Sequence, residues 1–342
     1  MEKASLQTAD SRGSPLSEIV RIPQIERLAL PGTLPHPRAL ASHKERELHY
    51  DPDMWELEYV TYRYLGRLND DDLRTRYDSI VRNMRSLIGE ERHVIPIRSF
   101  LSSWYWYRKE HLTRLEFAIR GLSLHRTLPT VDARDLSDAP ARHGGPNAGD
   151  VLFRYGERYW LKQMVEFGKV RIKAARVFAE MEKDPARRDD ERVKSSYSPG
   201  EYVTITLPNG RKSRIIGDLK ASAGGTDYFM YCVANDWGPE LFVDFKVDAC
   251  VVIQNPDEFA RRLKAAAPRL QDWYFYHGPV EYFDTHERRH HERIDNAMSK
   301  EFRFAYQRET RFIWAGFGRT ATGFIDLELG PLTDIATYTE YR

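Results

Sequence analysis

The sequence predicts an α+β fold, in which a split mixed or antiparallel β-sheet domain with flanking helices follows a small helical unit. From about residue 151, short apolar runs of strand length alternate irregularly with helical patterns, which favours α+β over a doubly wound sheet. Between residues 51 and 128 the apolar residues instead recur at helical spacing. The intervening segment 129–150 is rich in Pro, Gly, Ala and Asp, as is typical of an exposed linker. We therefore expect a flexible arm (1–50), a helical unit (51–128), a linker (129–150) and an α+β domain (151–342).

Composition narrows the class of protein. The 342 residues carry 52 Lys and Arg against 51 Asp and Glu, so a formal charge of +1 gives no overall attraction to nucleic acid or anionic lipid. Two cysteines, Cys232 and Cys250, make no disulfide framework and suit a reducing compartment. The first residues lack the apolar core of a signal peptide, and no apolar run approaches the roughly 18 residues of a spanning helix. We expect a cytoplasmic protein with no membrane partner.

The helical unit is predicted to contain three helices. Asp53 is the candidate cap of the first, and Asp70 to Asp72 open the second. The third runs from about Pro96 to Gly121. The predicted apolar stripes of the first two helices are Met54, Leu57, Val60, Tyr64 and Leu68, then Leu73, Tyr77, Ile80, Val81, Met84, Leu87 and Ile88. We expect such a unit to support self-association or contact with a partner.

The second half is predicted to hold strands at 151–155, 170–172, 228–233, 249–253, 273–276, 310–314 and 324–329. A hairpin is predicted where YVTITL and SRII flank Pro208-Asn209-Gly210. Helices are predicted at Arg158 to Phe167, Pro256 to Ala267 and Thr285 to Met298.

One candidate site is Gln307-Arg308-Glu309. If a strand starts near Glu309, its period of two places Gln307, Glu309 and Arg311 on one face. A fixed carboxylate beside an amide can stabilise the oxocarbenium-like state through which a nicotinamide–ribose bond breaks, as in glycoside cleavage. The alternative is a surface strand with a Glu-Arg pair.

Arg154 is a second candidate because it lies inside the apolar run Leu152-Phe153-Arg154-Tyr155-Gly156. A guanidinium kept in such a strand can grip a phosphate or carboxylate with two hydrogen bonds. Alternatively, it pairs with a neighbouring carboxylate of the fold.

Aromatic residues mark a third candidate, the run from Asp227 to Ile253. Tyr228, Tyr231 and Trp237 offer flat surfaces on which nicotinamide or adenine could stack. Aromatic residues in such runs also commonly form part of the core.

The order of these motifs resembles the ADP-ribosyltransferase toxin superfamily: an arginine in an early strand, then a middle strand with an aromatic turn and short helix, then a late Gln-x-Glu. It is also similar to uncharacterised bacterial domains that end in Tyr-Glu-x-Glu-x-Arg. The resemblance covers about residues 150–330. It implies a transferase of the glycosyltransferase class, an intracellular toxin or defence effector, that uses NAD as substrate and modifies an unidentified protein or nucleic-acid acceptor. By this resemblance Glu309 and Gln307 are catalytic, and Arg154, Tyr155, Tyr231 and Trp237 bind NAD, with no metal.

Two other functions stay open. Asp218, Asp244 and Lys246 are candidate parts of a metal-dependent PD-(D/E)xK-like nuclease, although Asp244 falls in a predicted short helix. A non-enzymatic module that binds nucleic acid or protein is the third option. The basic residues around His286, together with the aromatic and basic run Trp104-Tyr-Trp-Tyr-Arg-Lys, could stack on bases and contact phosphates. His286 and His290 have the spacing of zinc ligands on a helix, but the intervening Glu-Arg-Arg favours a solvated basic face.

Overall fold

The computed structural model describes residues 22–25, 52–87, 103–124, 151–181, 193–199, 204–214, 218–225, 227–235, 237–238, 240–286 and 295–340. The predicted linker (129–150) and all of the predicted arm except residues 22–25 lie outside these ranges. Within them, helices flank a mostly antiparallel sheet, and this confirms the predicted α+β class.

The described residues before 125 contain three helices: α2 (Pro52–Tyr62), α3 (Asp70–Leu87) and α4 (Ser103–Ile119). The predicted stripe of α3 is confirmed where Leu73, Tyr77 and Ile80 are buried. Of the first predicted stripe, Val60, Tyr64 and Leu68 pack against the helical core, but Met54 and Leu57 are half exposed. The larger Trp55 and Tyr59 are buried instead, since their rings remove more apolar surface from water, and the Tyr59 hydroxyl donates to Glu116 of α4.

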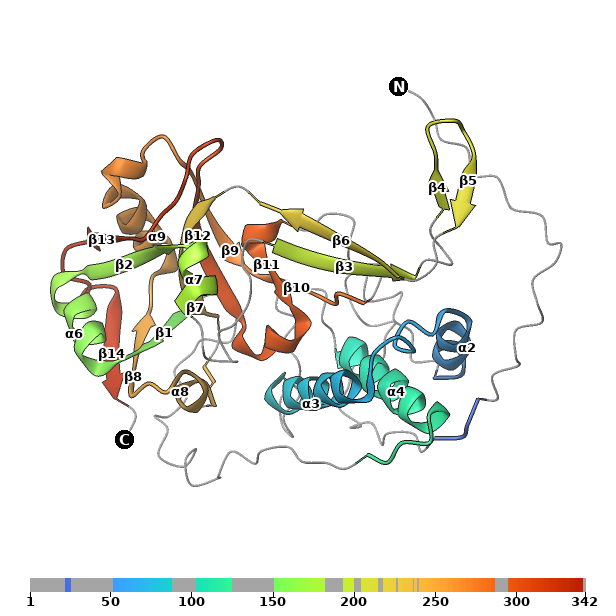
Figure 1. Cartoon of the computed structure of the whole chain (residues 1–342). Coiled ribbons are helices and arrows are strands. Elements are labelled where there is room, and N and C mark those ends of the chain that lie inside the picture. Colours follow the sequence, from blue (N-terminus) through green and yellow to red (C-terminus); the bar gives the residue numbers. More distant parts are fainter. Residues whose placement is uncertain are drawn as a thin grey trace.

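The main sheet has eight strands and divides beside its central strand, β7 (Tyr228–Ala234). One edge of β7 pairs along its length with β12 (Glu309–Ala315), which pairs in turn with β9 (Tyr274–Pro279). On the other edge, Phe229 and Met230 pair with β2 (Lys169–Ala174), whereas Ala234 pairs with β1 (Leu152–Gly156). The β2 branch continues to β13 (Phe324–Glu328), and the β1 branch to β8 (Ala249–Ile253) and β14 (Ala336–Glu340). Figure 1 shows the two branches separating beside α6 (Arg158–Phe167). The split sheet is therefore observed.

The two faces of this sheet bury different clusters. Helices α6 and α9 (Pro256–Ala265) cover one face, where Leu161 and Met164 of α6 and Phe259 of α9 join Tyr231 and Phe312 in the largest cluster. The other face carries a cluster around Phe153, Tyr155, Trp237 and Phe242, the last from α8 (Glu240–Phe245), and a second one around Met230 and Ile313, near α7 (Ala175–Met181). Successive residues of a strand therefore belong to different cores.

Outside the main sheet, the strands that the structure describes form three two-stranded pairs: β3 (Val193–Pro199) with β6 (Asp218–Gly224), β4 (Thr204–Thr206) with β5 (Lys212–Arg214), and β10 (Glu281–Phe283) with β11 (Ser299–Glu301). The pair β4–β5 is the hairpin predicted at Pro208-Asn209-Gly210. The sequence did not indicate β3, β6, β10, β11 or β14.

The helix predicted from Thr285 to Met298 is wrong at both described ends. Thr285 and His286 form a turn, and Asn296–Met298 is the 3-10 helix η5. Short carboxylate side chains explain this, because Asp284 accepts from the His286 N–H and Asp295 accepts from the Ala297 N–H, which closes local turns. His290, the other half of the possible zinc pair, lies outside the described residues.

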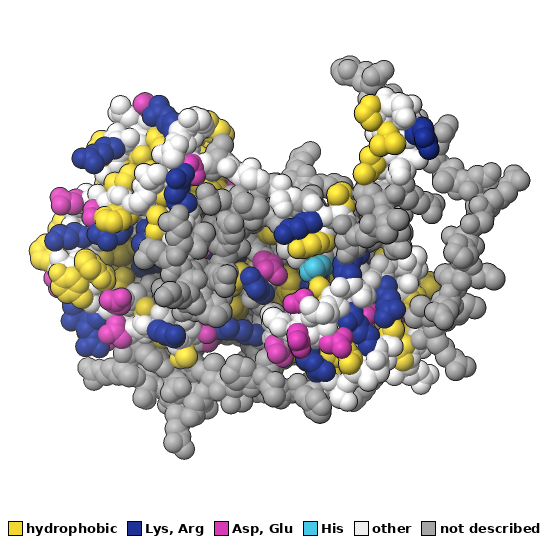
Figure 2. Space-filling view, in the orientation of Figure 1, with side chains coloured by type: hydrophobic (Ala, Val, Ile, Leu, Met, Phe, Trp, Pro, Cys, Tyr) yellow, Lys and Arg dark blue, Asp and Glu magenta, His cyan; other side chains and the backbone are white. Residues whose placement is uncertain are grey.

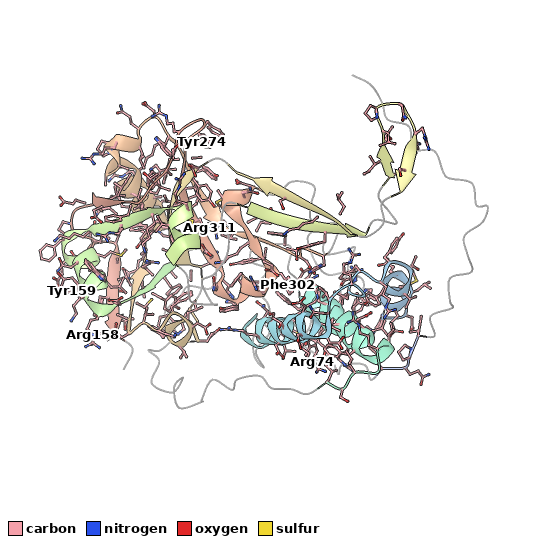
Figure 3. All side chains as sticks on the ribbon, in the orientation of Figure 1. Arg74, Arg158, Tyr159, Tyr274, Phe302 and Arg311 are labelled. Carbon is pink, nitrogen blue, oxygen red and sulfur yellow. The ribbon has the colours of Figure 1, made fainter. Side chains whose placement is uncertain are left out.

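The helices pack on the second half of the chain through η6 (Phe302–Gln307) and β10. One core cluster unites Ile80 of α3 and Trp106 of α4 with Tyr282 and Phe302. Figure 3 shows Phe302 between the sheet and the helices. The Asn83 side chain donates to the Arg303 carbonyl at 3.1 Å and adds a polar contact.

No helix in the described part of the chain is both long enough and apolar enough to cross a membrane.

Candidate functional site

The predicted catalytic residues lie where η6 passes into β12. Gln307 ends η6, Arg308 adopts a left-handed conformation with φ 44°, and Glu309 is the first residue of the strand. The turn at Arg308 is closed by its own N–H, which donates to the Ala305 carbonyl at 3.0 Å. The prediction that a strand starts near Glu309 is confirmed.

Lys300 of β11 connects the two side chains. Its Nζ donates to Gln307 Oε1 and to Glu309 Oε2, both at 3.0 Å, and Arg311 Nε donates to Glu309 Oε1 at 2.7 Å. All four side chains are buried, with Glu309 only 7% exposed and Arg311 fully enclosed. Figure 3 shows Arg311 in the interior, on β12. The arrangement is not the surface Glu-Arg pair that the sequence also allowed. We call these residues, Lys300, Gln307, Glu309 and Arg311, the Glu309 cluster.

The cluster holds Glu309 in its ionised form. Burial alone would raise the pKa of this carboxyl, but the charges of Arg311 and Lys300 outweigh it and hold the pKa of Glu309 well below its usual range. Two charge-assisted hydrogen bonds also fix the direction of the carboxylate. The result is a rigid negative charge inside the protein.

Tyrosines surround the cluster. The Glu309 N–H donates to Tyr282 Oη at 2.8 Å, and Gln307 Nε2 donates to Tyr306 Oη at 3.2 Å. Burial raises the pKa of Tyr306 to about 12, so its hydroxyl stays protonated at neutral pH. Arg82 of α3 lies 4.0 Å from the centre of the Tyr306 ring and also pairs with Asp244 of α8. A helix of the N-terminal part thus holds the η6 segment that carries Gln307.

Arg154 lies on the opposite face of the sheet from Glu309. Phe153 and Glu309 are each paired directly with Ala234, and directly paired residues share a face. Arg154 follows Phe153 and so points the other way. Its guanidinium donates to the Cys232 carbonyl at 2.9 Å and lies 4.9 Å from the centre of the Tyr231 ring. The structure therefore does not bring Arg154 to the Glu309 carboxylate.

The three aromatic residues predicted to bind NAD divide between these faces. Tyr155 and Trp237 lie on the Glu309 side in one cluster, with 5.9 Å between their ring centres. The Gly238 N–H donates to Tyr155 Oη at 2.9 Å. Tyr231 lies on the Arg154 side and packs against Phe259 of α9. All three rings are buried.

Sequence reasoning missed Lys300, which joins the two predicted catalytic residues. Its strand has only three residues, Ser299–Glu301, and nothing in that short run distinguishes a buried lysine from a solvated one. It also missed a second buried polar group, in which Asp284 pairs with Arg76 of α3 and Lys109 of α4. The only local sign was an aspartate directly after the two aromatic residues of β10, Tyr282 and Phe283.

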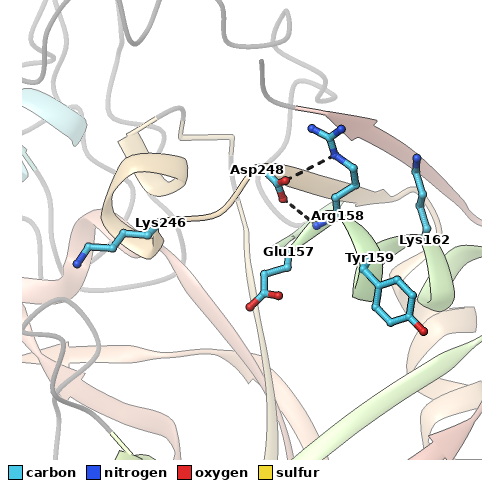
Figure 4. A pocket seen from close by; sticks show the side chains of 6 residues that line it. All are labelled: Glu157, Arg158, Tyr159, Lys162, Lys246 and Asp248. Carbon is cyan, nitrogen blue, oxygen red and sulfur yellow. Dashed lines mark hydrogen bonds and ion pairs between the residues drawn. The ribbon is translucent and has the colours of Figure 1, made fainter.

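A separate pocket of about 620 Å³ opens at the start of α6, and Figure 4 shows the six side chains that line it: Glu157, Arg158, Tyr159, Lys162, Lys246 and Asp248. The Arg158 guanidinium pairs with Asp248 at 3.5 Å, and Lys162 pairs with Glu340 at 3.1 Å, so acidic groups balance much of the positive charge of the pocket.

This pocket includes Lys246 of the nuclease alternative but not Asp244, which pairs with Arg82. Asp244 lies in α8, as the sequence predicted. Among the residues that the structure describes, no group of three His, Cys, Asp or Glu side chains could hold a metal ion.

Comparison with family models, with curated proteins and with solved structures gives no match for this chain in any of the three.

Proposed function

We propose that this protein cleaves the nicotinamide–ribose bond of NAD and transfers ADP-ribose to an acceptor, with Glu309 as the catalytic carboxylate and Gln307 beside it. One observation carries the proposal. A glutamate held ionised in the interior, with an amide tied to it through Lys300, provides a fixed negative charge where a ribosyl cation would form. The resemblance of the motif order to ADP-ribosyltransferases supports the choice of NAD.

The chemistry follows from the carboxylate. The glycosidic C–N bond breaks and its electron pair leaves with nicotinamide, while Glu309 stabilises the positive charge on the ribose. A hydroxyl, an amine or water then bonds to the ribose C1 and releases a proton. Arg311, Lys300 and the Cys232 side chain hydrogen-bond to the Glu309 carboxylate. A carboxylate has about four acceptor sites, so one remains for a ribose hydroxyl.

Burial adds a condition to the proposal. Because Glu309 is only 7% exposed, NAD reaches it only after the segment above it, η6 with β11, moves aside. Tyr155 and Trp237 lie on the same face as Glu309 and are the aromatic residues that could then receive nicotinamide or adenine. Arg154 and Tyr231 face away from Glu309. Their assignment to NAD stays a prediction, and it requires that NAD also contact the opposite face of the sheet.

The test is release of nicotinamide from labelled NAD by the full-length protein, with a cell extract as the source of protein and nucleic-acid acceptors. We expect release by the wild type and at least a hundredfold loss in Glu309→Gln and in Glu309→Asp. The aspartate variant keeps the negative charge but withdraws the carboxylate by one methylene, so it separates chemistry from folding. Glu258→Gln, which alters a partly exposed ion-paired glutamate of α9 far from the Glu309 cluster in the sequence, is the control.

Two outcomes would overturn the proposal. One is the absence of both nicotinamide release and NAD binding in the wild type. The other is equal release by the wild type and both Glu309 variants. In either case the Glu309 cluster is a buried structural ion-pair network.

A further inference from the structure

A two-stranded ribbon and a hairpin extend from the main sheet. Strands β3 and β6 pair antiparallel from Val193↔Gly224 to Pro199↔Asp218 and form a two-stranded sheet of their own. The hairpin β4–β5 lies between them in the sequence. Figure 1 shows β3 and β6 running away from the main sheet, with the hairpin beyond their far end and clear of the other described elements.

The hairpin is well formed locally but has no core beneath it among the described residues. The Leu207 N–H donates to the Arg211 carbonyl at 2.8 Å, and the turn places Gly210 at φ 78°. Every side chain from Thr204 to Ser213 is exposed, including Ile205 at 45%. An isolated two-stranded hairpin is only marginally stable in water. Contact with a partner would stabilise it, and this gives a physical reason for an exposed hairpin at this position.

Positive charge is concentrated in this part of the chain. Residues 193–224 contain five basic side chains and two acidic ones, whereas the whole chain has a net charge of +1. Three of the five, Arg211, Lys212 and Arg214, fall within four positions. Among the described residues, no carboxylate forms an ion pair with Arg211 or Lys212. The local field at the hairpin is therefore strongly positive although the chain as a whole is nearly neutral.

The hairpin carries side chains of the types that bind phosphate groups in protein–nucleic acid complexes. Lys212 is paired with Thr206, so an ammonium and a hydroxyl share one face, and Thr204 lies on that face two residues away. Asn209 and Ser213 add polar groups at the turn and on β5. Figure 2 shows the basic side chains (dark blue) and the hydrophobic ones (yellow) on opposite sides of the hairpin. Lysine, arginine, threonine, serine and asparagine are the usual donors to phosphate oxygens.

We infer that the β4–β5 hairpin is a nucleic-acid-binding element that lies in a groove of a double helix and contacts its phosphates. The major groove of B-form DNA is about 12 Å wide and admits a two-stranded ribbon. Residues 204–214 contain no Trp, Tyr or Phe, the residues by which a hairpin would anchor at a membrane interface. A duplex therefore fits the charge and the composition better than an anionic bilayer does.

The experiment titrates the full-length protein against a fluorescently labelled DNA duplex of mixed sequence at several salt concentrations. We expect binding that weakens steeply with salt. Arg211→Glu with Lys212→Glu should reduce the affinity at least tenfold and lower the slope of log affinity against log salt by about two, one for each phosphate that no longer meets a cation. Lys264→Glu with Arg269→Glu makes the same change of charge at exposed positions in and after α9, and it should bind nearly as the wild type does.

Three results would overturn the inference: no binding of the duplex by the wild type at low salt, equal loss in the two double variants, or hairpin-dependent binding to phosphatidylserine vesicles without binding to the duplex. The uncharged pair Arg211→Gln with Lys212→Gln serves if the glutamate pair impairs folding. Glu309→Gln should bind the duplex like the wild type, so the outcome does not depend on the NAD chemistry proposed above.

Discussion

Arg76 and Asp284 are 208 positions apart in the sequence and form a buried ion pair with two hydrogen bonds, one of which joins Arg76 Nη1 to Asp284 Oδ1 at 3.1 Å. Lys109 donates to the same carboxylate. Burial would raise the pKa of Asp284, but the charges of Arg76 and Lys109 hold it well below its usual range. Helices α3 and α4 are thus joined through one aspartate to the end of β10.

Asp284→Asn should destabilise the protein strongly. The substitution removes the buried carboxylate that Arg76 and Lys109 share, and breaking a buried pair in this way costs about 3–5 kcal/mol. Asp326→Asn removes the exposed partner of Arg171 and should cost less than about 1 kcal/mol. Urea unfolding of both variants provides the comparison, and similar losses in the two would contradict the importance assigned to Asp284.

Lys300→Met should destabilise the protein and raise the pKa of Glu309. It removes one of the two cations that hold this carboxyl ionised, together with the hydrogen bond from Lys300 to Gln307 Oε1. We expect a loss of about 3 kcal/mol in the free energy of unfolding at pH 7. Lys169→Met changes an exposed lysine of β2 and is the matched control. If chemical denaturation finds no difference between the two variants, Lys300 does not hold the cluster together.

His286 should make stability depend on pH. Burial lowers the pKa of its imidazole to about 4 from an ordinary value of 6.5, so the unfolded chain takes up its proton first as the pH falls. The contribution of His286 to the free energy of unfolding is fully present above about pH 6.5. It declines as the pH falls towards 4, by up to about 3 kcal/mol. His286→Phe keeps a ring to stack on Tyr197 but cannot titrate. Thermal unfolding between pH 7 and pH 4 should show a shallower decline for this variant, and parallel curves would rule the effect out.

Gly168→Ala should prevent normal folding or destabilise the protein by about 3–5 kcal/mol. Gly168 caps α6 at φ 69°, and an added Cβ would lie 2.0 Å from the Gly330 carbonyl oxygen, so a left-handed residue would also be overpacked. Gly210→Ala at φ 78° meets nothing within 4 Å and should cost only about 1–2 kcal/mol. The difference between the two melting temperatures measures the cost of the close approach.

Local signals predicted much of the α+β half. Strand β8 and helix α6 begin and end where the sequence places them, because each combines a strong apolar period with clear boundaries. The β4–β5 turn was predictable from Asn209-Gly210, whose chemistry is local. Strands β3 and β6 were not, since Val193–Pro199 and Asp218–Gly224 are polar and small, and they pair mainly with each other.

The candidate site was predictable in part. The sequence indicated that Gln307 and Glu309 lie at the start of a strand, and both do. It could not place Arg154 relative to them, because the face on which a residue lies depends on the register of β1 and β12 against β7. Lys300 was likewise out of reach, since a three-residue strand has too few positions to show a period.

The packing of α3 and α4 on η6 limits how this chain can be divided for study. A fragment that starts at residue 151 would expose Tyr282, Phe302 and Phe304 to water, and it would separate Asp284 from both of its cations. Such a fragment would tend to associate through that bare apolar surface. The boundary visible in the amino-acid sequence is therefore not a line along which the folded protein can be cut.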